Sequence, residues 1–335
     1  MKNKLLIYSL LVFFTTIIYA SSELKTTPMP FVVPEGWPKP TYDFSKNPLT
    51  KEGFELGRHL FYDPILSRDN TISCASCHLQ TTGFTHVDHD LSHGIDGKIG
   101  NRNSMTIMNT AWSNSFMWDG AVNHLDMQPL GPLSSFVEMD ENLENVVSKL
   151  NSSTKYKTLF NTAFGDSLAT GQRMLLAFSQ FIVQLNSYNS RYDKYIRKEV
   201  GGDFNTQEIN GLRLFRTHCA SCHTEPLFTN NGFEKNGLPI DTTLNDFGRM
   251  SVTRKAVDSL KFKVPTLRNS QFTFPYMHDG RFRKLRDVLN HYASADGLNT
   301  PIVLNSNEKT DIVAFLLTLT DNDFLFDKRF GFPRD

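Results

Sequence analysis

Residues 74–78 read Cys-Ala-Ser-Cys-His, and residues 219–223 repeat the same five residues. In the pattern C-x-x-C-H, two thiols add to the vinyl groups of a haem and the histidine supplies an axial nitrogen to its iron. A zinc site or a redox disulfide also uses C-x-x-C, but neither requires a histidine directly after the second cysteine. The chain therefore predicts two covalently bound c-type haems. The residues that would hold them are Cys74, Cys77 and His78 for the first haem and Cys219, Cys222 and His223 for the second.

The repetition extends beyond these two motifs. Short matches recur upstream and downstream of each motif, and they keep the same order along the chain. The matching pairs are 57–61 with 211–215, 102–104 with 268–270, and 117–120 with 277–280. A repeat with so long a period indicates two copies of one haem-binding domain and excludes a solenoid.

The pattern of apolar residues is mostly helical. Thr50 and Thr206 are placed to cap helices, and apolar side chains recur at helical spacing in two later segments. Segments rich in Gly, Asn, Asp and Pro separate the helices and are expected to form loops around the haems. The expected helices are 51–61, 207–215, 171–189 and 308–319, and the expected loops are 92–103 and 228–249. The predicted fold class is therefore mainly α, with two cytochrome c-like helical domains, each wrapped around one covalently bound haem.

The N-terminal segment is typical of an exported protein. Lys2 and Lys4 precede a short apolar stretch that ends at small residues near position 20, which is a signal-peptide pattern. An uncleaved anchor helix is the alternative, but the apolar stretch is shorter than the ~20 residues that span a bilayer. The sequence has no other long apolar run, so we expect no membrane span after cleavage.

The length of 335 residues suggests two domains. The expected divisions are a signal peptide at 1–20, an extended leader at 21–49, an N-terminal haem domain at 50–187 and a C-terminal haem domain at 188–335. The C-terminal helix is free to pack back on the first domain. Thirty-five basic and 35 acidic residues give a net charge of zero, which argues against a nucleic-acid partner.

With its motifs in this order, the chain resembles the bacterial dihaem cytochrome c peroxidases and their relative MauG, from about Leu49 to Leu319. The resemblance implies a periplasmic enzyme whose N-terminal haem meets hydrogen peroxide. Its C-terminal haem would take electrons from a c-type cytochrome or a cupredoxin, and the protein would form a homodimer. The resemblance also implies a calcium ion between the domains, bound by Asn103, Thr273 and Pro275.

The resemblance assigns three further residues to the peroxide site. Glu138 matches a distal glutamate, which would move protons between the two peroxide oxygens as their bond breaks. Gln128 matches a glutamine that would hydrogen-bond peroxide or water. Trp118 matches a tryptophan placed between the haems, where it would shorten the electron path.

Two positions help to distinguish a typical dihaem peroxidase from a MauG-like enzyme. Tyr292 stands where many peroxidases place a methionine ligand to the second iron, and MauG also has a tyrosine there. Met250, Met277, His278 and His291 are the alternative ligands in this region.

His93 lies near the position of a removable distal ligand of the first iron, which MauG lacks. His86 and His89 share its segment, so the register of the distal histidine stays open. We therefore expect a dihaem peroxidase, with a MauG-like oxidase of a partner protein and a non-enzymatic dihaem electron carrier as the alternatives.

Overall fold

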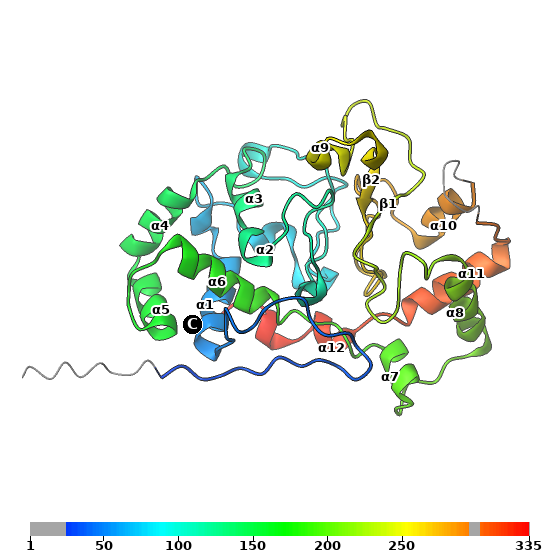
Figure 1. Ribbon diagram of the computed structural model, residues 1–335, viewed down its shortest axis with the longest axis horizontal. Coiled ribbons are helices and arrows are strands. Elements are labelled where there is room, and N and C mark those ends of the chain that lie inside the picture. Colours follow the sequence, from blue (N-terminus) through cyan, green and yellow to red (C-terminus); the bar gives the residue numbers. More distant parts are fainter. Residues whose placement is uncertain (1–24, 295–301, 335) are drawn as a thin grey trace, which may run out of the picture.

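The computed structural model describes residues 25–294 and 302–334, so the expected signal peptide at 1–20 lies outside the described residues. The chain forms two groups of helices that lie side by side (Figure 1). The first group contains α1 (Lys51–Tyr62), α2 (Cys74–Cys77), α3 (Leu130–Ser134), α4 (Leu143–Ser152), α5 (Thr154–Phe164) and α6 (Gly171–Ile182). The second contains α7 (Arg191–Arg197), α8 (Thr206–His218), β1 (Phe233–Lys235), α9 (Met250–Thr253), β2 (Lys261–Lys263), α10 (Leu285–Ser294) and α11 (Ser306–Leu317). The short helix α12 (Asn322–Leu325) follows.

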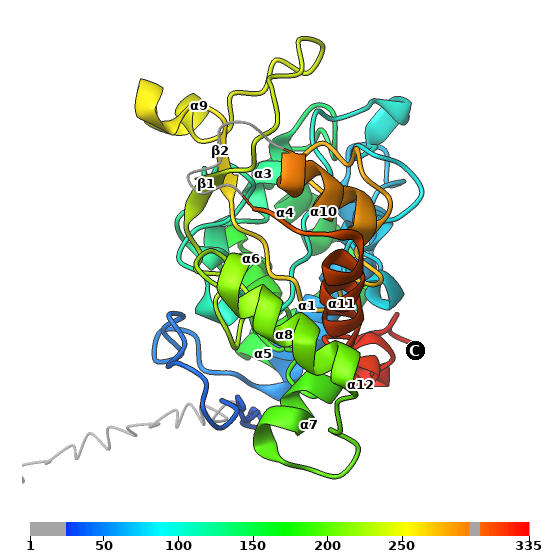
Figure 2. The ribbon, with the colours of Figure 1, turned by 90° about the vertical axis from the view of Figure 1, so that its right-hand side faces the viewer.

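The same pair of crossed helices organises both groups. Helix α1 crosses α6 at Gly57, where a β-carbon would collide with the carbonyl oxygen of Ala177. Helix α8 crosses α11 at Gly211, where a β-carbon would collide with the carbonyl oxygen of Asp311. Figure 2 shows α8 and α11 packed side by side. Glycine is required at both crossings because the backbones approach too closely for any side chain.

The predicted N-cap of the first of these helices is observed, and that of the second is not. The Thr50 hydroxyl accepts a hydrogen bond from the Gly53 amide at 3.0 Å, which confirms the predicted start of α1. The prediction for the second domain was wrong by one residue, because Asn205 caps α8. Its side-chain oxygen accepts from the Glu208 amide at 2.9 Å, and Glu208 accepts in return from the Asn205 amide. This reciprocal capping box fixes the earlier residue as the cap.

Two other predicted segments also differ from the structure. The helix expected over 171–189 ends at Ile182, although Leu185 remains fully buried in the segment that follows. The predicted loop over 228–249 contains β1, which pairs antiparallel with β2 and places Phe233 opposite Lys263. Three-residue strands give too short an alternation to be seen in a sequence.

Each group of helices has its own apolar core. The first contains α1 and α6, and it also takes in Phe324, Leu325 and Phe330 from the C-terminal end of the chain. Tyr62 of α1 donates a 2.7 Å hydrogen bond to the carbonyl oxygen of Phe330, which ties this end down. The second core surrounds α8 and α11. The C-terminal segment therefore crosses from the second core back to the first.

Polar contacts join the two groups of helices. The Lys263 amide donates to the carbonyl oxygen of Trp118 at 2.7 Å, and the Asn103 amide donates to that of His278 at 2.7 Å. The Arg102 guanidinium also bridges Asp119 and the buried Asp246. Because these hydrogen bonds join the backbones of the two groups of helices, they fix the position of Trp118 and its neighbours between the groups.

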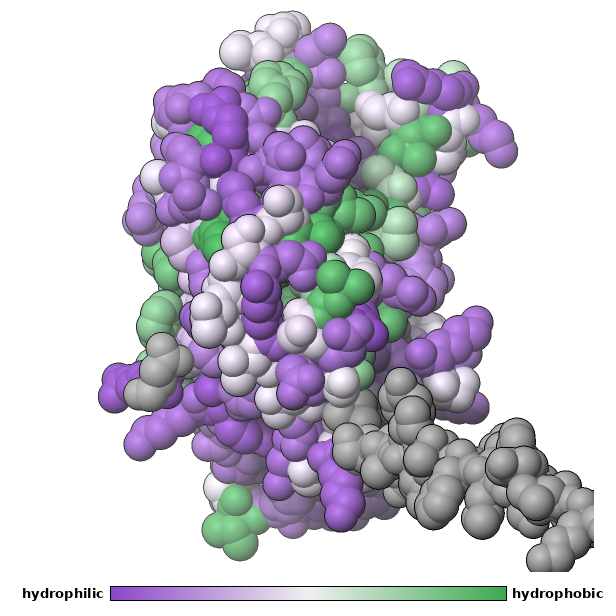
Figure 3. Space-filling view, turned by 90° about the vertical axis from the view of Figure 1, so that its left-hand side faces the viewer, coloured by the Kyte–Doolittle hydropathy of each residue, from purple (hydrophilic) through white to green (hydrophobic). Residues whose placement is uncertain are grey.

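The outer face of the first group, which includes α4 and α5, is mostly hydrophilic, with apolar side chains gathered near its centre (Figure 3). Within the part of the chain that the structure describes, no helix is both long enough and apolar enough to cross a membrane.

Candidate active site

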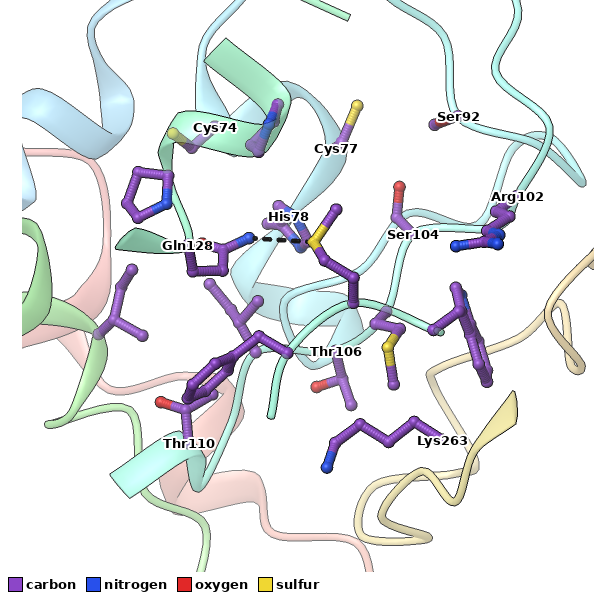
Figure 4. A pocket seen from close by; sticks show the side chains of 18 of the residues that line it. Cys74, Cys77, His78, Ser92, Arg102, Ser104, Thr106, Thr110, Gln128 and Lys263 are labelled. Atoms are coloured by element: carbon purple, nitrogen blue, oxygen red, sulfur yellow. Dashed lines mark hydrogen bonds between the residues drawn. The ribbon is translucent and has the colours of Figure 1, made fainter. Parts of the chain in front are cut away.

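A cavity of about 300 Å³ lies in the first domain, beside α2. Cys74, Cys77 and His78 line it together, and Lys263 enters it from β2 of the second domain (Figure 4). The three residues of the first C-x-x-C-H motif therefore face one enclosed space.

His78 is held in the orientation that an iron ligand requires. Its Nδ1 lies 2.8 Å from the carbonyl oxygen of Phe84, so Nδ1 carries the proton and Nε2 is the nitrogen available to a metal. Burial lowers the pKa of His78, which keeps the imidazole neutral. A neutral imidazole whose other nitrogen donates to a backbone carbonyl is the usual arrangement of an axial haem histidine.

The two thiols of this motif are free and protonated. Burial raises the pKa of Cys74 to about 12 and that of Cys77 to about 11. Reactive thiolates and CxxC redox centres require the opposite shift. The site therefore fits thioether attachment of a haem better than redox chemistry at sulfur.

The second motif repeats this geometry. His223 Nδ1 lies 3.2 Å from the carbonyl oxygens of Phe228 and Pro265, and burial lowers the pKa of His223. Cys219 and Cys222 are also free. The orientation of the histidine and the two free thiols therefore fit a second haem.

Tyr292 projects from α10 toward the second motif. Burial raises the pKa of its phenol, and the nearby thiols of Cys219 and Cys222 raise it further. The neighbouring histidines are engaged elsewhere: His291 Nε2 lies 2.7 Å from the carbonyl oxygen of Asn236, and the His278 ring stacks on Phe262. Of these three side chains, Tyr292 is the one whose pKa the thiols of Cys219 and Cys222 raise.

Glu138 lines the first cavity on the turn that follows α3. Burial raises the pKa of its carboxyl group. The backbone holds this turn in place, since the Ile95 amide donates to the carbonyl oxygen of Glu138 at 2.8 Å. Gly94 allows this close approach, because a β-carbon there would collide with the carbonyl oxygen of Val137.

Gln128 and Trp118 line the same cavity. Gln128 follows a short 3-10 turn, and its Nε2 donates to the thioether sulfur of Met117 at 3.7 Å (Figure 4). The indole nitrogen of Trp118 donates to the carbonyl oxygen of Asn103 at 2.8 Å. The structure thus gathers Glu138, Gln128 and Trp118 around the first motif.

His93 lies at the edge of this cavity. Its carbonyl oxygen is 3.5 Å from the sulfur of Cys77, and its ring meets that of His89 edge-on, with centroids 3.9 Å apart. The His86 ring lies 5.0 Å from that of His89, and both of its nitrogens are buried without a hydrogen-bond partner among the described residues. The three histidines therefore form one cluster.

The three predicted calcium ligands are not joined to one another by side-chain hydrogen bonds in the described part of the chain. Asn103 is buried, and its side-chain nitrogen Nδ2 donates to the carbonyl oxygen of Asp90 at 3.0 Å. Among residues 25–294 and 302–334, no hydrogen bond joins Asn103 to Thr273 or Pro275. The ligand set remains a prediction.

Two residues of this cavity were missed in the sequence. Met117 belongs to the repeated segment 117–120, but nothing in that pattern identified its sulfur as a cavity atom. Lys263 comes from the second domain, and its buried ammonium lies 3.1 Å from Asn231 Oδ1. Burial disfavours the charged form of Lys263 and lowers its pKa to about 8, and an anionic group beside it, such as a haem carboxylate, would stabilise the charge.

Two C-x-x-C-H sites, each with an oriented histidine and free, partly buried thiols, are the arrangement expected of a dihaem redox protein. Residues 51–201 match the family model described as di-haem cytochrome c peroxidase. The chain is 33% identical to the methylamine utilization protein MauG of Methylorubrum extorquens, over 85% of this chain and 82% of that protein. It is 34% identical to the cytochrome c551 peroxidase of Nitrosomonas europaea, over 79% of each chain.

Among solved structures, a MauG-like protein associated with microbial copper homeostasis is similar, with a TM-score of 0.81 and 29% identity. The match covers 91% of this chain and 99% of that one. The chain therefore belongs to the dihaem cytochrome c peroxidase family, whose members hold two haems, and it is an oxidoreductase of the peroxidase type.

Proposed function

We propose that the protein reduces hydrogen peroxide to water in the periplasm, with electrons from a small c-type cytochrome or cupredoxin. The single observation that supports this function best is the carboxyl group of Glu138 in the first cavity, with a raised pKa. An electron carrier needs no acid or base beside its haem, whereas peroxide reduction must move protons between two oxygens.

The chain's own residues divide the work in this proposal. Cys74, Cys77 and His78 would hold the first haem, which would supply the iron for cleavage of the peroxide O–O bond. Glu138 accepts the proton of the nearer peroxide oxygen and returns it to the departing one. Gln128 orients peroxide through its amide group.

The second site would receive the electrons. Cys219, Cys222 and His223 would hold its haem, and Tyr292 would supply a phenolate to its iron. Because a phenolate is a hard anionic donor, it would favour ferric iron and lower the reduction potential. Trp118 lies between the sites and shortens the electron path. The proposal includes the calcium ion at Asn103, Thr273 and Pro275, the homodimer and the domain division near residue 187.

The test is peroxide consumption by the haem-loaded mature protein, with reduced cytochrome c as donor. Glu138→Gln should lower turnover by about 10²–10⁴-fold, the usual contribution of a general acid–base, and leave both haem spectra unchanged. Glu144→Gln, on the exposed start of α4, is the matched control. Turnover that survives in Glu138→Gln would contradict the assignment.

A MauG-like oxidation of a partner protein is the second candidate. The position of Tyr292 beside the second motif supports it, since the resemblance to MauG implies a tyrosine ligand there, and the chain is 33% identical to a MauG protein. Slow turnover with a long-lived oxidised species after peroxide addition would support this reading. Fast turnover with cytochrome c would support the peroxidase.

A further inference from the structure

We propose that the ammonium group of Lys263 forms an ion pair with a propionate of the first haem, so that the second domain helps to set the reduction potential of that haem. The inference rests on the proposed function, because it requires a haem attached at Cys74, Cys77 and His78. It extends that function, because it gives the second domain a direct effect on the iron that would meet peroxide.

Lys263 is a buried cation without an acidic partner. The residue is 7% exposed, and its Nζ lies 3.1 Å from Asn231 Oδ1 and 3.5 Å from Ser115 Oγ. Within residues 25–294 and 302–334, no carboxylate lies at ion-pair distance from this Nζ. Arg268 is also buried, but it donates to both carboxylate oxygens of Asp193 at 2.8 Å. Because burial of an unpaired charge is costly, Lys263 needs an anion to keep its charge.

The wall of the first cavity does not supply this anion. Glu138 is the only carboxylic acid among the described residues that line the cavity. It lies near the thiols: burial raises the pKa of Cys74 and of Cys77, and the charge of Glu138 raises both further. Figure 4 shows Lys263 on the opposite side of the cavity from these two cysteines. The remaining source of an anion is a group bound in the cavity.

A haem attached at the first motif would bring its own carboxylates to this side. The vinyl groups that add to cysteine thiols lie on one half of the porphyrin ring, and the two propionates lie on the other half. Since Cys74 and Cys77 line one side of the cavity, the propionate edge would face the side where Lys263 enters. An ammonium group has three N–H donors, and Asn231 and Ser115 engage at most two of them. One donor remains for a propionate oxygen.

Contacts between the domains hold the ammonium group in place. Asn231 Oδ1 also accepts from Ser113 Oγ at 3.1 Å, and Asn231 Nδ2 donates to the carbonyl oxygen of Trp112 at 3.2 Å. The backbone amide of Lys263 donates to the carbonyl oxygen of Trp118 at 2.7 Å. The charge is therefore fixed relative to the first domain, although β2 belongs to the second.

A fixed positive charge favours the ferrous state of the first haem, because reduction adds an electron near that charge. At an effective dielectric constant near 20, a unit charge ~10 Å from a redox centre changes the ratio of its reduced and oxidised forms by about tenfold. A tenfold change corresponds to about 59 mV for one electron. Lys263 thus makes the first haem easier to reduce with electrons from the second site.

The test is the midpoint potential of the first haem in protein loaded with two haems. Ferric EPR signals, recorded during a potentiometric titration, separate the two irons because their axial ligands are expected to differ. Lys263→Met should lower the first midpoint by about 59 mV, the tenfold change given above, and should shift it more than the second. Lys261→Met is the matched control on the same strand, because Lys261 is paired with Asp258 and is not among the residues that line the cavity. This control should keep both midpoints.

Lys263→Arg keeps the charge, so it separates the effect of the charge from an effect of the substitution on the fold. Its first midpoint should stay closer to wild type than that of Lys263→Met. A first midpoint that Lys263→Met leaves unchanged, or that both variants lower equally, would overturn the proposal. Absence of peroxide turnover in wild type, with the midpoints as expected, would instead contradict the proposed peroxidase function.

Discussion

The indole nitrogen of Trp118 donates a 2.8 Å hydrogen bond to the carbonyl oxygen of Asn103. The Asn103 amide in turn donates to the carbonyl oxygen of His278, and the Trp118 carbonyl accepts from the Lys263 amide. Trp118 is therefore attached at its ring and at its backbone to groups that contact the second domain. Its ring orientation and the packing of the domains depend on each other.

Trp118→Phe should slow electron transfer between the haems and destabilise the domain contact. The variant keeps an aromatic ring but leaves the Asn103 carbonyl without its donor, which costs about 1–3 kcal/mol when the group is buried. Stopped-flow reduction of the second haem, followed by re-oxidation through the first, measures the rate. Trp37→Phe, on the leader, is the control. An unchanged rate in Trp118→Phe would remove this residue from the electron path.

Tyr292→Phe should change the spectrum of the second haem alone. The buried phenol lies beside the thiols of Cys219 and Cys222, so its removal takes away the proposed phenolate ligand. Loss of an anionic donor should also raise the reduction potential of that haem. His291→Phe is the matched control on the same helix. If the two variants have the same second-haem spectrum as wild type, Tyr292 is not a ligand.

The pH profile of peroxide reduction should follow Glu138. Burial raises its pKa, so the carboxylate that accepts the peroxide proton is lost at a higher pH than in a free glutamate. The acid limb of kcat/KM should therefore lie above the ordinary value near 4.5. Glu144→Gln should keep this limb, while the residual activity of Glu138→Gln should not show it. An acid limb that is identical in both variants belongs to another group.

The haem-attachment motifs are local and can be predicted from the sequence. Contacts between segments far apart in the chain cannot. The two attachment cysteines and the first axial histidine expected for each haem lie within five consecutive residues, so their spacing alone predicts His78 and His223. The environment of Met117 depends on Gln128, eleven residues away, and on folding of the turn between them. Lys263 reaches the first cavity from the second domain, and no local pattern reports such a contact.

His86 should make the protein sensitive to acid. Burial, and to a smaller extent the neighbouring His89, lower its pKa from 6.5 to about 4. The unfolded chain therefore binds a proton on His86 between pH 6.5 and 4 that the folded chain does not bind. The stability that the neutral His86 contributes is present above pH 6.5 and is lost as the pH falls toward 4.

Urea unfolding of the haem-loaded protein at a series of pH values tests this prediction. Near pH 5, unfolding of wild type should take up about one more proton than unfolding of His86→Asn, so the variant's stability should fall less steeply with acid. Equal slopes in the two proteins would show that His86 titrates alike in the folded and unfolded chain, because only a difference in bound protons makes stability depend on pH.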